Sequence, residues 1–135
     1  MRDVERAATF YRDVLGLTLR SQVPGRAAFL GIRADASHEV ALFPLPADAP
    51  GPEPGRVGMY HMAWEMPSFE ALQQLHARLL SNGVHITGYS PRQVNVMFLD
   101  PDGNELEALW EPSEEELRRF EATGQGLPRL NPDAA

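Results

Sequence analysis

The stretch "FLDPDGNELEALW", residues 98–110, decides how the chain folds. Asp100 to Gly103 have the composition of a tight turn, and the apolar residues on either side predict two strands joined by it. In the second strand, alternate residues face opposite sides. Glu105 and Glu107 therefore share one face, and the opposite face carries Leu106, Ala108 and Trp110. The carboxylate face is either solvated or lines a cleft where one carboxylate binds a metal ion.

The composition is typical of an ordinary soluble globular protein. The chain has 135 residues, of which 43% are hydrophobic and 23% charged, enough for a buried core. The formal net charge of −7 argues against a nucleic-acid partner and against anionic membrane surfaces. No apolar run has spanning length, no leader opens the chain, and the absence of cysteine excludes disulfides and thiolate sites. We therefore expect a cytoplasmic protein with a small-molecule partner.

The same pattern of elements occurs twice along the chain. A helix over residues 3–15, capped by Asp3 and ended by Gly16, precedes strands at "LTLRS", "RAAFLGI" and "HEVALFPL". In the second half, the strand "GMYHMAWEM" comes first. A helix capped by Ser68 and ended by Gly83 follows, and then strands at "HITGY", "VNVMFLD" and "ELEALW". Each half is therefore expected to form one small α+β module.

The repeat also predicts the domain organisation. The expected parts are module one at 1–45, a Pro- and Gly-rich linker at 46–57, module two at 58–111, and a C-terminal acidic helix with a frayed tail at 112–135. When Asp3 is matched with Ser68, the counterpart of "GMYHMAWEM" falls before Met1. The first module is therefore expected to lack its leading strand. A partner could supply that missing edge, so we expect a homodimer.

His61 and Glu107 are the candidate metal ligands. In "GMYHMAWEM", His61 shares one strand face with Ala63 and Glu65, away from the bulky Tyr60, Met62, Trp64 and Met66. A single strand histidine is more often structural, and Glu107 alone would be taken for a surface carboxylate. Equivalent strands of two modules can converge on one cleft, and an imidazole with a carboxylate suits a divalent first-row metal.

Three phrases in this chain resemble the vicinal oxygen chelate superfamily, which includes glyoxalases, bleomycin-resistance proteins and extradiol dioxygenases. They are "DPDGNELE", "YHMAWEM" and "RDVERAATFYRDVLGL", and the resemblance runs along nearly all of residues 2–111. It implies a single α+β domain at 1–111, with paired βαβββ modules that form a curled mixed sheet cup around a metal. It also implies that Glu107 is the carboxylate ligand and that Glu105 is solvated.

Within this superfamily the sequence is most similar to single-domain catechol extradiol dioxygenases. That resemblance implies Fe(II) held by two histidines and one carboxylate, with Mn(II) or another divalent metal as the alternative. It also implies a catechol-type aromatic substrate and O₂ as the second substrate. His61 and Glu107 would be two ligands, and His38, at the start of "HEVALF", would be the catalytic acid–base group. The alternative for His38 is a surface histidine at a strand end.

The chain departs from the dioxygenase pattern at three positions. The first histidine ligand would lie in the leading strand of module one, upstream of Met1. Met97 falls where an active-site tyrosine is expected, and "GYSPRQ" holds no counterpart of the substrate-positioning histidine. His85 lies on the wrong side of that segment, and His76 is expected to serve packing or the surface of its helix.

Two other functions remain open for the same fold. The first is a glyoxalase-type metal-dependent isomerase, lyase or thiol transferase with Mn, Zn or Ni. That class usually adds a fourth ligand in the last strand of module one, where Glu39 is expected to point away from His38. The second is a non-catalytic binding or resistance protein without metal, which the presence of His61 and Glu107 disfavours.

Overall fold

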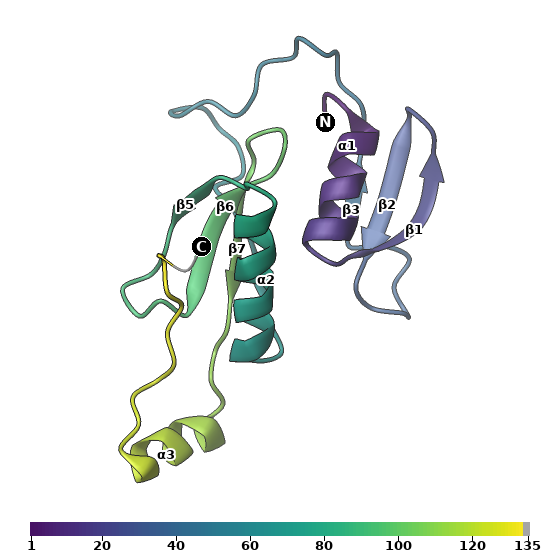
Figure 1. Cartoon of the computed structure of the whole chain (residues 1–135). Coiled ribbons are helices and arrows are strands. Elements are labelled where there is room, and N and C mark those ends of the chain that lie inside the picture. Colours follow the sequence, from purple (N-terminus) through teal and green to yellow (C-terminus); the bar gives the residue numbers. More distant parts are fainter. Residues whose placement is uncertain (134–135) are drawn as a thin grey trace. The chain divides into compact units, whose positions relative to one another are not determined.

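The computed structural model describes residues 1–133, and the chain divides into two compact units. The first unit comprises Met1–Gly58 together with Asp100–Asn104. The second comprises Met59–Leu99 and the residues from Glu105 onward. Each unit contains a sheet and at least one helix (Figure 1), which confirms the expected α+β class.

In the first unit, a helix packs on one face of an antiparallel sheet with the strand order β1-β2-β3 (Figure 1). The elements are α1 (Val4–Thr9), the π-helical turn η1 (Phe10–Val14), β1 (Thr18–Val23), β2 (Ala27–Gly31) and β3 (Val40–Leu42). The covered face of the sheet and the facing side of the helix form the core, which includes Val4, Ala7, Tyr11, Ala28, Leu30, Val40 and Leu42. The three strands after the helix match the expected order.

The first helix begins where the sequence predicts and changes its winding before it ends. The carboxylate of Asp3 accepts a hydrogen bond from the backbone N–H of Arg6, so Asp3 is the N-cap. A regular helix up to residue 15 was expected, but the N–H of Leu15 donates to the carbonyl of Phe10 at 3.2 Å, which is the wider π spacing. Gly16, with φ of +86°, then ends the helix.

The strand predicted over "HEVALFPL" is shorter than expected, and this changes the position of His38. β3 contains only Val40–Leu42. The carboxylate of Glu39 turns back to accept hydrogen bonds from the N–H groups of Ile32 and Arg33, so the residues before β3 form a loop. His38 therefore does not continue the face of Val40 and Leu42, because strand alternation does not extend into that loop.

The second unit contains a mixed sheet with the strand order β4-β7-β6-β5. Its elements are β4 (Met62–Glu65), α2 (Phe69–Ser81), β5 (Ile86–Gly88), β6 (Asn95–Leu99), β7 (Glu105–Leu109) and α3 (Glu114–Thr123). β4 pairs with β7 in parallel, and the other pairs are antiparallel. The hydroxyl of Ser68 accepts from the N–H of Ala71, so Ser68 caps α2 as predicted. None of the described helices is long and apolar enough to cross a membrane.

The C-terminal segment is more ordered than its Gly- and Pro-rich sequence suggests. The acidic helix α3 forms as expected, with a capping box made by Ser113 and Glu116. The tail beyond it was expected to be frayed, yet Leu130 is only 3% exposed. Its N–H donates to the carbonyl of Gln93 at 2.8 Å. The tail is therefore anchored to the loop that precedes β6.

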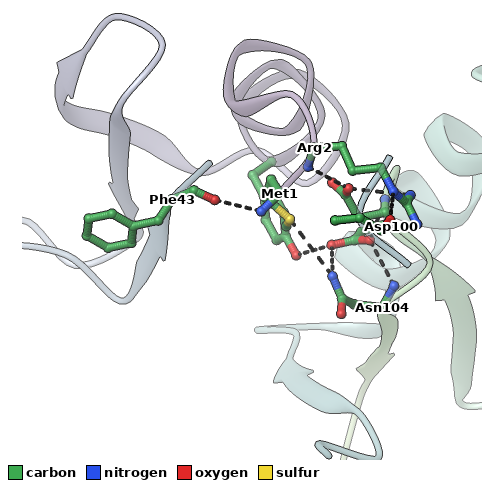
Figure 2. A network of polar contacts seen from close by, with 8 residues as sticks. Met1, Arg2, Phe43, Asp100 and Asn104 are labelled. Atoms are coloured by element: carbon green, nitrogen blue, oxygen red, sulfur yellow. Dashed lines mark hydrogen bonds and ion pairs between the residues drawn. The ribbon is translucent and has the colours of Figure 1, made fainter. Parts of the chain in front are cut away.

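The turn at Asp100–Gly103 is fixed by a buried carboxylate in the first unit. Gly103, with φ of +88°, donates its N–H to the carbonyl of Asp100 at 3.0 Å, which closes the predicted turn. Both oxygens of the Asp100 side chain accept hydrogen bonds: Oδ1 from the N–H groups of Asp102 and Asn104, and Oδ2 from Tyr11 Oη and Asn104 Nδ2. Figure 2 shows this network together with Met1 and Arg2.

Candidate metal centre

The second unit's sheet has one buried and one partly open face. The buried face carries Val96, Phe98, Leu106 and Ala108, all with 0% exposure. Glu107 lies on the other face, where its pairing partners are Ala63 of β4 and Met97 of β6. Glu105 lies on the same face and accepts a hydrogen bond from Thr87 Oγ1 at 2.7 Å. The carboxylate of Glu107 is thus at the centre of the open face.

The structure brings the side chains of His61 and Glu107 into direct contact. His61 immediately precedes β4, which runs parallel to β7 and next to it. Its Nε2 atom lies 3.2 Å from Oε2 of Glu107. Both side chains are mostly buried, with 26% and 17% of their surfaces exposed. The face expected from strand alternation is therefore the face on which these two groups meet.

The separation of these two atoms suits two ligands of one metal ion. Ligand nitrogen and oxygen atoms lie about 2.1 Å from a divalent first-row metal, so two ligands at right angles are about 3.0 Å apart. The observed 3.2 Å between His61 Nε2 and Glu107 Oε2 is close to that value. Both atoms also belong to groups that such metals prefer. The pair therefore fits two neighbouring coordination positions.

Within the described residues, no third ligand joins the pair. No group of three or more His, Cys, Asp or Glu side chains that could hold a metal occurs in this part of the chain. The second ring nitrogen of His61, Nδ1, is buried and has no hydrogen-bond partner among these residues. The pair supplies two ligands, and the remaining positions of an ion would go to other groups.

Asn95 supports Glu107, and the sequence analysis did not identify it. Its side chain is at the start of β6, and the residue is only 7% exposed. Nδ2 donates a hydrogen bond to Oε1 of Glu107, while Oδ1 accepts one from the N–H of Ser90. The only hint in the sequence is a polar residue that shares the strand face of Met97. Its partner becomes evident only when the strands are paired.

His38 is in the first unit and is exposed at the end of the loop before β3. Its Nδ1 atom lies 3.0 Å from the hydroxyl of Ser37, and its ring meets the ring of Phe29 edge-on with centroids 5.0 Å apart. Phe29 pairs with Ala41 of β3. His38 is therefore on the side of the sheet away from α1, together with aromatic side chains.

When the two modules of the internal repeat are matched strand by strand, Ala41 of β3 takes the position of Glu107 of β7. Ala41 pairs with Phe29 in the middle of β3, as Glu107 pairs with Met97 in the middle of β7. Alanine therefore occupies the position where a carboxylate of the first module would face away from its helix. Glu39 cannot replace it, because its carboxylate is bonded to the backbone of residues 32 and 33.

The other histidines have structural surroundings. His76 of α2 is 4% exposed, and its Nε2 lies 2.8 Å from the hydroxyl of Tyr89. Burial lowers the pKa of His76, which favours the neutral ring in this contact. This confirms the expectation of a packing residue. His85 is exposed, and its carbonyl accepts from the N–H of Leu99.

Comparisons with known proteins agree with the fold. The model of the Glyoxalase/Bleomycin resistance protein/Dioxygenase superfamily matches residues 1–108. A lactoylglutathione lyase from Agrobacterium tumefaciens is 25% identical, with a TM-score of 0.59, and the match covers 81% of this chain and 86% of that one. No curated protein shows significant sequence similarity to this chain.

Two further solved structures share the fold at lower identity. A glyoxalase/dioxygenase from Nostoc punctiforme is 22% identical, with a TM-score of 0.65 and coverage of 84% of this chain and 86% of that one. A fosfomycin resistance protein from Listeria monocytogenes, solved with Mn(II) and sulfate, is 18% identical, with a TM-score of 0.62 and coverage of 89% and 90%.

Proposed function

Because the chain belongs to the Glyoxalase/Bleomycin resistance protein/Dioxygenase superfamily, we propose that it is a metal-dependent enzyme in which His61 and Glu107 are two of the metal ligands. The observation that carries this proposal is the 3.2 Å contact between His61 Nε2 and Glu107 Oε2. A divalent metal held by these atoms would polarise neighbouring oxygen atoms of a bound substrate. The metal could be Fe(II) or Mn(II), since both accept imidazole and carboxylate ligands.

The test of the metal centre compares carboxylates of one strand. Glu105→Ala is the matched control for Glu107→Ala, because both side chains lie on the open face of β7. We expect Mn(II) to raise the melting temperature of the original protein and of Glu105→Ala. His61→Ala and Glu107→Ala should each abolish that increase, and the double variant should add little. An undiminished increase in either single variant would place the metal elsewhere.

For the reaction, we propose ring cleavage of a catechol-type aromatic by an extradiol dioxygenase that uses Fe(II) and O₂. Ala41 supports this choice over a four-ligand site, since no acidic residue occupies the position in β3 that corresponds to Glu107. A cytoplasmic homodimer is part of the same proposal.

In this reaction His38 would act as the acid–base group. Its Nδ1 atom contacts the hydroxyl of Ser37, which leaves Nε2 to accept a proton from a substrate hydroxyl. His38→Ala should leave metal binding intact and lower catechol turnover by about 10²–10⁴-fold. Oxygen uptake by the Fe(II)-loaded protein with a panel of catechols measures this. Uptake that the substitution does not change would remove His38 from the proposal.

The second candidate is a glyoxalase-type isomerase, lyase or thiol transferase. The 25% identity with a lactoylglutathione lyase favours it, and the Mn(II) bound to the fosfomycin resistance protein suits it too. Formation or breakdown of lactoylglutathione by the Mn(II)-loaded protein, without oxygen uptake on any catechol, would select this candidate. If the protein shows neither of these activities but binds a flat ligand without metal, the non-catalytic alternative is selected.

A further inference from the structure

Asn95 connects the candidate metal centre to the loop that precedes β6. Its amide has two polar ends, and each has a partner: Nδ2 donates to Oε1 of Glu107, and Oδ1 accepts from the N–H of Ser90. A backbone N–H can only donate, so the amide oxygen must face Ser90 and the amide nitrogen must face Glu107. The orientation of the Asn95 side chain is therefore fixed by the backbone of the loop.

This arrangement gives the two oxygens of Glu107 different tasks. Oε1 is held by the amide of Asn95, and Oε2 faces His61 Nε2 at 3.2 Å. The terminal torsion of a glutamate side chain is broad, so an unsupported carboxylate rotates and can present either oxygen or both. A donor on Oε1 stops that rotation and leaves one oxygen directed to the metal position.

We propose that Asn95 is the positioning residue of the metal centre and holds Glu107 as a ligand that binds through Oε2 alone. This inference rests on the proposed function, since it assigns Asn95 to the same metal. Asn95 is 7% exposed and donates to Oε1 of Glu107, so it acts through the carboxylate and not as a ligand itself. Residues that orient a metal ligand typically contribute ten- to a hundredfold to metal affinity.

The loop before β6 belongs to this support. Gln93 has φ of +55°, a left-handed conformation that is uncommon for residues other than glycine. Its carbonyl accepts from Leu130, and the neighbouring carbonyl of Val94 accepts from the N–H of Trp110 at 2.9 Å. These bonds hold the loop in the shape that presents the N–H of Ser90 to Asn95.

The test uses two substitutions at Asn95 and a control on the same sheet face. Asn95→Ala removes both hydrogen bonds, and Asn95→Leu does so while keeping the side-chain volume, in case the smaller residue impairs folding. Thr87→Val is the matched control, because it removes a hydrogen bond to Glu105, the other carboxylate of that face. Mn(II) affinity is measured by calorimetry, and circular dichroism verifies that each variant is folded.

We expect a folded Asn95 variant to bind Mn(II) ten- to a hundredfold more weakly than the original protein, and Thr87→Val to bind it equally well. The visible spectrum of bound Co(II) should also change in the Asn95 variants, because a carboxylate free to bind through both oxygens alters the coordination number. A purely structural role would leave this spectrum unchanged.

Two different failures can be told apart. If the original protein binds Mn(II), Glu107→Ala does not, and both Asn95 variants match the original in affinity and Co(II) spectrum, the role of Asn95 is overturned and the metal centre stands. If the original protein binds neither Mn(II) nor Co(II), the proposed function fails, and the role of Asn95 fails with it.

Discussion

Replacing Tyr11 with phenylalanine should destabilise the first unit through the loss of one hydrogen bond. The Tyr11 side chain is 1% exposed, and its hydroxyl donates to Oδ2 of Asp100 at 2.9 Å. Phenylalanine keeps the ring and its edge-on contact with Phe10, so no cavity of ring size is created. The change therefore isolates the hydroxyl of Tyr11 from the packing of its ring.

The expected magnitude follows from the surroundings of Asp100. Its carboxylate accepts four hydrogen bonds, and Tyr11→Phe removes one of them. Hydrogen bonds to charged groups contribute about 1.5–3 kcal/mol, and the three remaining donors place this loss near the lower end. For a chain of this size, that corresponds to a decrease in melting temperature of roughly 5 °C.

The pH dependence of this effect is also defined. Burial and the neighbouring Asp100 raise the pKa of Tyr11, so its hydroxyl keeps its proton, and can donate, throughout the neutral range. The destabilisation should therefore be the same at pH 6.5 and pH 8.5. Urea unfolding followed by circular dichroism measures it, with a check that different probes give coincident transitions.

Tyr89→Phe is the matched control for this measurement. It removes a phenol hydrogen bond to the neutral ring of His76, which should contribute only about 0.5–1.5 kcal/mol. A loss in Tyr11→Phe no larger than in Tyr89→Phe would refute the argument that the carboxylate of Asp100 makes the difference. A loss that appears only above pH 8 would refute the assigned donor.

Two further predictions concern the second unit. Burial lowers the pKa of His76 from 6.5, so the unfolded chain binds the proton more readily, and the free energy of unfolding should fall as the pH drops below 6.5, by at most about 1.4 kcal/mol per pH unit. Urea unfolding at pH 7.5 and 5.5 should therefore show a smaller decrease in His76→Gln than in the original protein. The exposed His85→Gln is the control. Leu130→Ala should weaken the free energy of docking the tail by about 2 kcal/mol or less and speed hydrogen exchange at the amide of Ser90. Equal exchange rates in the variant and the original protein would show that the tail does not hold the loop.

The sequence was most informative where a structure depends on neighbouring residues. The caps at Asp3 and Ser68 and the turn that ends at Gly103 each depend on one or two side chains within four residues, and each was predictable. The contact between His61 and Glu107 agrees with the faces expected from alternation, but it also depends on the parallel pairing of β4 with β7, and His61 lies one residue before β4.

The sequence was least informative where a contact depends on distant residues. The strand predicted over "HEVALFPL" was too long, because the hydrogen bonds of Glu39 to the backbone of residues 32 and 33 place His38 in a loop before β3. The role of Asn95 depends on which carboxylate lies beside it once β6 and β7 have paired. Leu130, a single apolar residue in a Pro- and Gly-rich tail, gave no local indication that it would dock.

The docking of Leu130 has a consequence for biosynthesis. Chains leave the ribosome from the N-terminus and can fold as they emerge. Every strand of the second unit precedes Leu130, so these strands emerge before the backbone partner of Gln93. During that interval the loop before β6 has one fewer anchor. The amide of Asn95, which depends on that loop, would thus become fully anchored beside Glu107 only after the tail has emerged and docked.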